Sequence, residues 1–283
     1  MIHDVIERIA VIHRPDAGGD VLAWKDRVYG FVTSHFPKAS ITNPEDAQVV
    51  IVLGGDGSIL EVAKRYSENN PLIFGLNMGH VGFLASVRNE VDFEAGISKL
   101  LTGHFHVSKR SMIRTSLIRR GVTLCTTECL NDVFVKSLAG MCELSISIDG
   151  TDVQRVRGTG VLVSTPTGST AFNLSAHGPI IMPTIRCMAM TELLDHDIPT
   201  PSVIVDGDQE LRIKILSFRK SNTFVLKNNN EPVDVILSAD SADVYPLEVE
   251  DEVLVSMSDK TVSIVELEDG YFVKSLREKF SFK

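Results

Sequence analysis

The sequence predicts a two-part protein. We expect an α/β domain with a Rossmann-like parallel sheet, then an all-β domain, and last a C-terminal helix that returns to the first domain. Over the first hundred residues, short apolar runs alternate with segments of helical periodicity, which is typical of a parallel sheet covered by helices. After Gly103 the runs become short, β-branched and separated by turns, as in antiparallel sheets. The predicted domains are residues 1–103 and 104–267, with residues 268–283 packing back on the first domain.

The elements of the first domain follow from the spacing of its apolar residues. A strand is expected at Ile9–Ile12, and apolar positions three or four residues apart predict a helix over Asp20–Phe36. The uninterrupted apolar run Val49–Leu53 indicates a strand that is buried on both faces. We expect Ser58 to cap the helix that follows, with Glu61 completing a capping box. A further strand is expected at Leu72–Leu76 and a further helix at Val91–Leu101.

The second domain is predicted from short β-branched runs and from turn dipeptides. Asp149-Gly150 and Asp206-Gly207 are typical of β-hairpin turns. At the end of the chain, Tyr271–Phe280 fits a short helix. The runs expected to form strands are Thr115–Ile118, Asp132–Val135, Leu144–Ile148, Val161–Val163, Val203–Val205, Leu211–Ile215, Val233–Leu237 and Val253–Val255.

Composition narrows the classes of partner. The net charge of −9 argues against nonspecific binding to nucleic acid, which depends on a basic surface. No apolar run approaches the roughly 18 residues of a membrane span, and Asp4 and Glu7 precede the first apolar stretch, unlike a secretory signal. The four cysteines show no paired spacing typical of zinc. We expect a cytoplasmic protein with reduced thiols and neither a nucleic-acid nor a membrane partner.

A glycine-rich turn, Gly54-Gly55-Asp56-Gly57-Ser58, follows a predicted strand and precedes a predicted helix. Ligands of parallel sheets bind at the carboxyl ends of strands. Consecutive glycines let backbone N–H groups approach phosphate oxygens, and the helix dipole favours their charge. Gly54, Gly55, Gly57 and Ser58 are therefore candidate phosphate-binding residues. The carboxylate of Asp56 would repel a phosphate, so we interpret it as a group that handles a proton or helps hold a metal ion. The alternative is an ordinary tight turn.

A second loop, Ser164–Thr170, combines hydroxyl residues with glycine directly after the apolar run Val161–Val163. Glycine allows the backbone to come close to a ligand, and hydroxyl groups add short hydrogen-bond donors. A helix start is expected just after the loop, and helix N-termini favour anionic groups. The two loops together predict a binding site for a phosphorylated small molecule.

The order and spacing of four segments resemble the NAD kinase family. These are Gly54–Ser58 (GGDGS), Gly75–Leu84 (GLNMGHVGFL), the pair Asn131-Asp132, and Thr165–Pro179. The likeness runs from about Ile9 to the C-terminal helix. The glycine turn alone is a weak signal, since phosphofructokinases and lipid kinases share it, whereas STPTGSTAF together with GHVGFL is highly specific.

The resemblance implies a kinase that transfers the γ-phosphoryl group of ATP, or of another phosphoryl donor, to the 2′-hydroxyl of the adenosine ribose of NAD, giving NADP. It implies NAD and ATP as substrates, with Mg²⁺ or another divalent ion accompanying ATP and no metal ligand assigned within the chain. It also implies a homodimer or homotetramer, because such enzymes often complete the pocket with a neighbouring subunit.

The resemblance also assigns roles to residues. Asp56 would accept the proton of the ribose hydroxyl, with Gly57 beside it. Asn131 and Asp132 stand where an Asn-Glu pair of the family binds the ribose or adenine region. Arg157 stands at a basic position that meets a phosphate, the alternative being an exposed arginine on a strand. The segment that would line the NAD pocket is Thr170, Ala171, Phe172, Asn173, Leu174 and Ser175.

Three positions depart from the family pattern. Thr159 stands where the family has aspartate, Phe172 replaces a tyrosine, and Ala242 stands where glutamine is common. Each lost polar contact costs about 0.5–1.5 kcal/mol of binding free energy when its partner can still reach water. We therefore expect these departures to change the affinity for substrate and the preference between NAD and NADH.

Two alternative functions stay open at this point. One is a lipid kinase of the diacylglycerol or sphingosine type, which shares the glycine turn and a β-rich second domain. The hydroxyl-rich loop favours a dinucleotide over a lipid. The other is a non-catalytic NAD(P) sensor, which the altered pocket positions would fit. A sensor would bind the dinucleotide without turnover.

Overall fold

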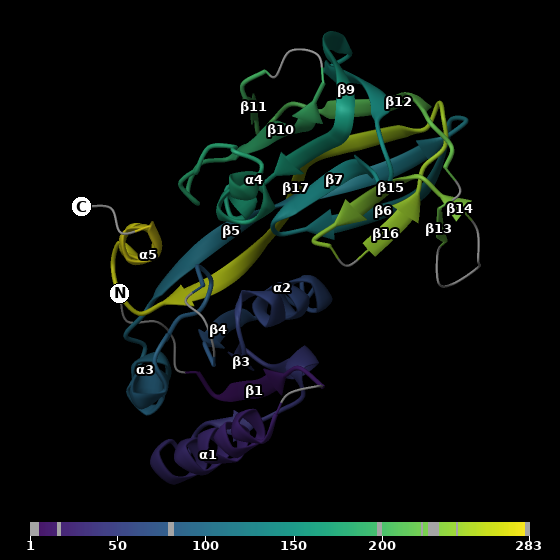
Figure 1. Ribbon diagram of the computed structural model, residues 1–283. Coiled ribbons are helices and arrows are strands. Elements are labelled where there is room, and N and C mark those ends of the chain that lie inside the picture. The colour runs from purple at the N-terminus through teal and green to yellow at the C-terminus, as the bar shows by residue number, and fades with distance from the viewer. Residues whose placement is uncertain are drawn as a thin grey trace. The chain divides into compact units, whose positions relative to one another are not determined.

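The computed structural model of the protein describes residues 6–15, 18–78, 82–196, 200–221, 223–225, 232–241 and 243–280 (Figure 1). They form two compact units. Unit 1 comprises the described residues up to Arg110 and from Thr261 onward, and unit 2 comprises those from Ser111 to Lys260. Strands β5 (His106–Arg119) and β17 (Glu252–Glu266) contribute residues to both units. Because these strands run on without a break, no loop marks the boundary, and the assignment of domains at residues 103 and 268 stays a prediction.

Unit 1 contains a parallel sheet in the order β2-β1-β3-β4-β17. The last part of β17 joins it by pairing Ser263 with Leu72. All five residues of β3 are buried, which confirms the prediction of a strand covered on both faces. The remaining strands of this sheet are β1 (Arg8–His13), β2 (Ser40–Ile41), β3 (Val49–Leu53) and β4 (Leu72–Leu76).

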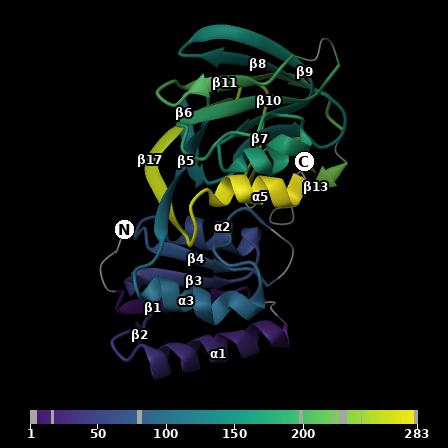
Figure 2. The same ribbon diagram turned by 90° about the vertical axis from the view of Figure 1, so that its left-hand side faces the viewer.

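Helices cover both faces of this sheet (Figures 1 and 2). On one face, Val28 and Val32 of α1 and Ile97 of α3 share a core with alternate residues of the strands, such as Val49 and Ile51. Helix α2 covers the other face (Figure 1). The helical segments of unit 1 are α1 (Gly19–His35), α2 (Asp56–Arg65), α3 (Phe93–Leu101), α5 (Tyr271–Phe280) and the 3₁₀ turns η1 (Pro44–Asp46) and η2 (Glu90–Asp92).

The predicted capping box at Ser58 is wrong. Helix α2 begins at Asp56, its N-cap is Gly55, and no side chain caps it. The N–H groups of Ser58 and Ile59 donate to the carbonyl oxygen of Gly55 at 3.0 and 3.2 Å, so the first turn closes on the glycine and Ser58 lies buried inside it. Glu61 is consequently an interior residue of the helix.

Unit 2 is built from antiparallel strands. The path β16-β15-β7-β9-β8-β12-β17 is extended by β10, which pairs with β9 and β11, and by β6, which pairs with β5. Its remaining strands are β6 (Val122–Cys129), β7 (Asp132–Ser137), β8 (Cys142–Ile148), β9 (Thr151–Ser164), β10 (Cys187–Asp195), β11 (Val203–Asp206), β12 (Leu211–Phe218), β13 (Phe224–Val225), β14 (Pro232–Val233), β15 (Val235–Ala239) and β16 (Asp243–Pro246). The 3₁₀ turn η3 (Gly168–Thr170) and helix α4 (Phe172–Ser175) follow β9.

Of the two predicted hairpin turns, one is confirmed. Asp149-Gly150, with φ of 48° and 78°, joins the paired strands β8 and β9. Asp206-Gly207 is a turn, but β11 before it pairs with β10, whereas β12 after it pairs with β8 and β17. The dipeptide therefore sets a local turn without setting which strands pair. The predicted run Val233–Leu237 is likewise divided, since Val233 belongs to β14 and β15 begins at Val235.

The cysteines of unit 2 contribute to its apolar core. Cys129 and Cys142 lie in this core, and Cys125 packs against it. None of the helices in the described part of the chain is long and apolar enough to cross a membrane.

Candidate functional site

Asp56 lies at the carboxyl end of β3 as the first residue of α2. Its carboxylate accepts hydrogen bonds from the N–H groups of Phe83, at 2.7 Å, and Leu84, at 3.1 Å. A Cβ at Gly82 would collide with this carboxylate, so a glycine is needed for the segment after β4 to pass so close. The half-buried side chain is thus held in one orientation, and each oxygen keeps a lone pair for another contact.

The glycine turn beside Asp56 offers backbone donors. The N–H groups of Gly55, Asp56 and Gly57 have no acceptor among the described residues. The N–H of Gly54 donates to Leu76 at 3.0 Å, and that of Ser58 is used within the turn. Successive free N–H groups at a helix N-terminus form a concave site for anions. Of the four predicted phosphate-binding residues, Gly55 and Gly57 therefore keep backbone donors free.

In unit 2, the pair Asn131-Asp132 is held by residues from two other segments. The carboxylate of Asp240, after β15, accepts from the N–H groups of Leu130 and Asn131 at 2.8 Å and of Asp132 at 3.2 Å. From the hydroxyl-rich loop, the N–H of Thr165 donates to the carbonyl oxygen of Asn131 at 2.8 Å. These hydrogen bonds fix the backbone of Asn131 and Asp132. Sequence reasoning missed Asp240, whose only signal is an acidic residue in the turn that ends an apolar strand.

The hydroxyl-rich loop packs tightly on the same pair. A Cβ at Gly168 would collide with the carbonyl oxygen of Asn131, and the hydroxyl of Thr165 donates to the carbonyl oxygen of Leu130 at 2.5 Å. The close approach at Gly168 is to the backbone of Asn131, whereas the approach of this loop to a ligand stays a prediction. The hydroxyl groups of the loop serve partly to bind the segment that contains Leu130 and Asn131.

The side chain of Asp132 is buried, with 4% of its surface exposed. Burial, together with the negative charge of Asp240, raises the pKa of Asp132 to about 7. Its carboxyl group has no hydrogen-bond partner among the described residues. Buried polar groups in proteins are normally hydrogen-bonded, so this carboxyl group is suited to bind polar groups of a ligand such as sugar hydroxyls.

A cavity of about 560 Å³ lies in unit 2. Among the residues predicted to bind substrate, Thr159, Phe172 and Ser175 line it. The ring of Phe172 packs edge-on against Phe134, with centroids 5.6 Å apart. Lining residues that sequence reasoning missed include Lys136, Thr191, Glu192, Asp195, Thr200 and Ser202. They come from strands and loops that only tertiary structure brings beside β9, and no local signal marks them.

Other predicted residues lie outside the lining of this cavity. Asn173 is fully buried, and its side chain donates to the carbonyl oxygen of Pro179 at 3.0 Å and accepts from the hydroxyl of Thr191 at 2.8 Å. It holds α4 against β10. Thr170, Ala171 and Leu174 are half-buried. Arg157 is exposed on β9. Ala242 and the part of the GHVGFL motif at residues 79–81 fall outside the described residues.

The comparisons with known proteins match both halves of the chain. The ATP-NAD kinase N-terminal domain matches residues 18–105, and the ATP-NAD kinase C-terminal domain matches residues 130–267. The chain belongs to the NAD kinase family. The NAD kinase of Symbiobacterium thermophilum is 34% identical over 238 residues, covering 83% of this chain and 79% of that protein. The NAD kinase of Acidobacterium capsulatum is 31% identical over 297 residues, covering 98% and 99%.

Solved structures of NAD kinases share the fold. A yeast NADH kinase complexed with NADH has a TM-score of 0.84 at 20% identity, covering 99% of this chain and 89% of that one. An NAD kinase from Archaeoglobus fulgidus in complex with ATP has a TM-score of 0.72 at 22% identity, covering 97% of each chain. These findings confirm the resemblance to NAD kinases, and they support neither a lipid kinase nor a non-catalytic sensor.

Proposed function

We propose that this NAD kinase uses Asp56 as the base that deprotonates the adenosine 2′-hydroxyl of NAD. In the reaction, a bond forms between the 2′-oxygen and the γ-phosphorus of ATP while the bond from that phosphorus to the bridging oxygen breaks. NADP and ADP result, and the hydroxyl proton passes to Asp56. The observation that supports this role is the carboxylate held by Phe83 and Leu84, next to free backbone donors at Gly55 and Gly57.

The chain's contribution is mainly positional. Phosphoryl transfer passes through a loose, metaphosphate-like transition state, so positioning and charge stabilisation dominate. The free N–H groups of Gly55 and Gly57 would bind phosphate oxygens of the donor, and a fixed base adds about 10²–10⁴-fold in rate. Because the donors are backbone groups at a helix N-terminus, they add no mobile side chain to be ordered when the donor binds.

The divalent ion is proposed to enter with ATP. Among the described residues there is no group of three or more His, Cys, Asp or Glu side chains that could hold a metal ion. Mg²⁺ is usually held by substrate phosphates and water with one or two carboxylates, so we propose that the ion arrives bound to the phosphates of ATP. When bound, the ion neutralises charge on the phosphates.

In unit 2, the dinucleotide site is proposed to include Asn131 and Asp132, whose side chains have no partner among the described residues. They would hydrogen-bond the ribose hydroxyls, and Phe172 would supply an aromatic wall. Arg157 is exposed and so has access to a phosphate group from solvent. The segment from Thr170 to Ser175 would shape the pocket, with Asn173 acting through its contacts to Pro179 and Thr191.

The experiment that tests the proposal is an assay of purified protein with MgATP and each of three acceptors: NAD, NADH and diacylglycerol. We expect NADP to form from NAD and no phosphorylated lipid to appear. Phosphorylation of the lipid with none of NAD would overturn the proposal. Tight binding of NAD without product would identify a sensor instead.

The departure at Thr159 yields a first prediction. Thr159 lines the cavity beside Lys136, whose positive charge would offset that of a new carboxylate. Thr159→Asp is expected to lower the Kd for NAD by about 2- to 10-fold, equivalent to one hydrogen bond of about 0.5–1.5 kcal/mol. Isothermal titration calorimetry measures it, with Thr159→Val as the uncharged control. Weaker or unchanged binding of Thr159→Asp would contradict this account.

Location and assembly remain proposals. None of the four cysteines, all of which lie in the described segments, forms a disulfide, which is typical of proteins from a reducing compartment and supports the cytoplasm. The resemblance to the family is the basis on which we propose a homodimer or homotetramer, and a monomer in sedimentation velocity would contradict this proposal.

A further inference from the structure

We propose that Tyr271 and Arg88 are positioning residues for phosphoryl transfer: through them, helix α5 holds residues 82–88 in the place where this segment fixes Asp56. We call residues 82–88 the clamp segment. The inference rests on the proposed role of Asp56 as base.

The clamp segment contacts Asp56 through its backbone at one end. The N–H groups of Phe83 and Leu84 donate to the two carboxylate oxygens. Gly82 passes so close that a Cβ at this position would displace the carboxylate of Asp56. Any shift of the segment would therefore move the carboxylate or break its hydrogen bonds.

The middle of the clamp segment is tied to the sheet. The N–H groups of Ser86 and Val87 both donate to the carbonyl oxygen of Gly75 in β4, at 2.8 and 3.0 Å. The hydroxyl of Ser86 donates to the carbonyl oxygen of Val265 in β17 at 2.6 Å. Val87 also forms a parallel bridge with Leu76 of β4, so these bonds hold Ser86 and Val87 beside this strand.

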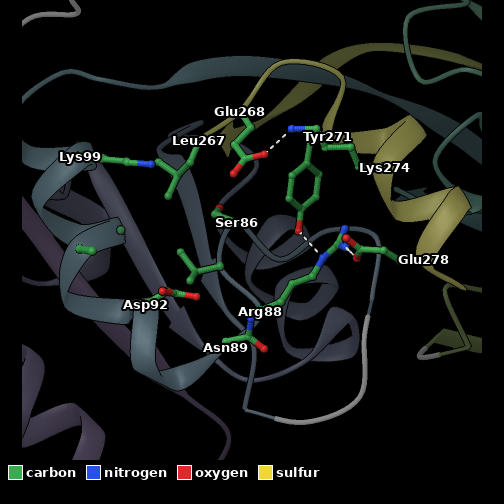
Figure 3. Close-up of a pocket in the computed structure, with 13 residues that line it drawn as sticks. Ser86, Arg88, Asn89, Asp92, Lys99, Leu267, Glu268, Tyr271, Lys274 and Glu278 are labelled. Carbon is green, nitrogen blue, oxygen red and sulfur yellow. Dashed lines mark hydrogen bonds and ion pairs between the residues drawn. The ribbon is translucent and has the colours of Figure 1, made fainter.

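Helix α5 also holds the clamp segment. The hydroxyl of Tyr271 donates to the carbonyl oxygen of Ala85, and Nε of Arg88 donates to the same hydroxyl at 2.8 Å. The guanidinium also donates to Glu278 and Ser275, and it lies over the Tyr271 ring at 4.5 Å from the centroid. Figure 3 shows Arg88 pointing at Tyr271 and Glu278. One tyrosine and one arginine thus join α5 to the clamp segment.

The protonation state of the Tyr271 hydroxyl suits its role as a donor to Ala85. Burial raises the pKa of Tyr271 to about 12, so its hydroxyl keeps its proton and donates to Ala85 at all physiological pH values. A second contact supports the first, because the ring of Phe83 packs against Phe272 and Phe280 of α5, with centroids 5.8 and 6.2 Å apart. The residue whose N–H binds Asp56 is therefore itself seated on α5.

Arg88 and Tyr271 border open space as well as packed side chains. A cavity of about 310 Å³ lies next to Arg88 and Tyr271 and is also lined by Asp92, Gly96 and Lys99 (Figure 3). Ser86, Val87 and Arg88 of the clamp segment also line this cavity, so loss of the polar contacts would remove a restraint on the side of the segment where space is open. The bridge is thus the restraint we expect to matter for the base.

The test is a double-mutant cycle between Tyr271 and Asp56. Tyr271→Phe keeps the ring and removes the hydroxyl bridge. We expect it to lower kcat by about 10- to 100-fold, because misplacement of a catalytic group by about 1 Å has this effect, with KM for NAD changed less than about twofold. In an Asp56→Asn background the same substitution is expected to change the residual kcat less than about twofold, since it acts through Asp56.

Arg88→Lys tests the second half of the bridge and should lower kcat in the same way. The matched controls are Tyr29→Phe and Arg27→Lys on α1, where Arg27 also combines an ion pair with a ring contact, to Glu94 and Trp24. We expect both controls to keep the parent kcat. Equal losses from Tyr271→Phe with and without Asp56, or no loss in either, would overturn the inference.

Amide hydrogen exchange separates this inference from the proposed function. In Tyr271→Phe, exchange at Phe83 and Leu84 is expected to quicken by about 10-fold or more while the β3 amides keep their protection. If the parent makes no NADP, the proposed function fails, yet faster exchange would still show that α5 holds the clamp segment. Unchanged exchange at Phe83 and Leu84 would overturn the inference whatever the activity.

Discussion

Asp56→Asn is expected to lower kcat for NADP formation by about 10²–10⁴-fold, or about 3–5 kcal/mol in the barrier. The amide is nearly the same size, and its oxygen can still accept one of the N–H groups of Phe83 and Leu84. It cannot accept the proton of a hydroxyl group, however. A loss confined to kcat, with KM for NAD little changed, is the expected pattern for a group that acts only in the transition state.

Steady-state kinetics and thermal unfolding together test this prediction. The control is Asp26→Asn, an exposed aspartate on α1, which should keep full activity. Gly82→Ala provides an independent variant, because its methyl group would displace the same carboxylate. Parent-like rates for a folded Asp56→Asn protein would exclude Asp56 as the base.

Asp132→Asn is expected to raise the free energy of unfolding above about pH 7 and to leave it nearly unchanged below about pH 4. In the folded protein, burial and the charge of Asp240 raise the pKa of Asp132 to about 7. The folded state therefore binds this proton more tightly than the unfolded state does. In the parent, the contribution of this one group to stability is fully present below its unfolded pKa and is lost as the pH rises through the folded pKa, by up to about 4 kcal/mol at 1.36 kcal/mol per unit.

Urea unfolding across about pH 4–8 measures the difference. Asparagine cannot ionise. In the variant, the free energy of unfolding should therefore not show the decrease with rising pH that the ionisation of Asp132 causes in the parent. Asp152→Asn, at an exposed position of β9, serves as the control and should follow the parent. If the parent and Asp132→Asn unfold with the same dependence on pH, the carboxyl group does not stay protonated in the folded state. Loss of NAD affinity in this variant would separately support the proposed contact with ribose.

Several elements could be predicted from the sequence because local chemistry decides them. Val49–Leu53 and Leu72–Leu76 form strands with the predicted bounds, since uninterrupted apolar runs of this length favour buried strands. Tyr271–Phe280 forms the predicted helix. The prediction of a cap at Ser58 was wrong because the carbonyl group of Gly55 closes the first turn of the helix. The prediction of a hairpin at Asp206-Gly207 was wrong because a turn dipeptide does not specify which strands pair.

The candidate site was predictable only in part. The position of Asp56 after a buried strand was predicted, and its place at the start of α2 agrees with it. Its hydrogen bonds to Phe83 and Leu84 were not, because these donors belong to another segment of the chain. The hydrogen bonds from Asn131 and Asp132 to Asp240 could not be predicted for the same reason. Contacts across such sequence separations depend on which strands lie together, and no local pattern encodes them.

By itself, the sequence determined the family, the strands β1, β3 and β4 and the helices between them in the first unit, and the identity of the carboxylate proposed as base, but it gave no sign of β2 or of the part of β17 that joins this sheet. These follow from apolar periodicity and from motif spacing, both of which are local along the chain. Only the tertiary structure decided what holds that carboxylate, which residues line the cavity of unit 2, and why Asp132 has a raised pKa. Orientation, enclosure and burial arise when distant segments pack together, and each depends on side chains and amides far away in sequence.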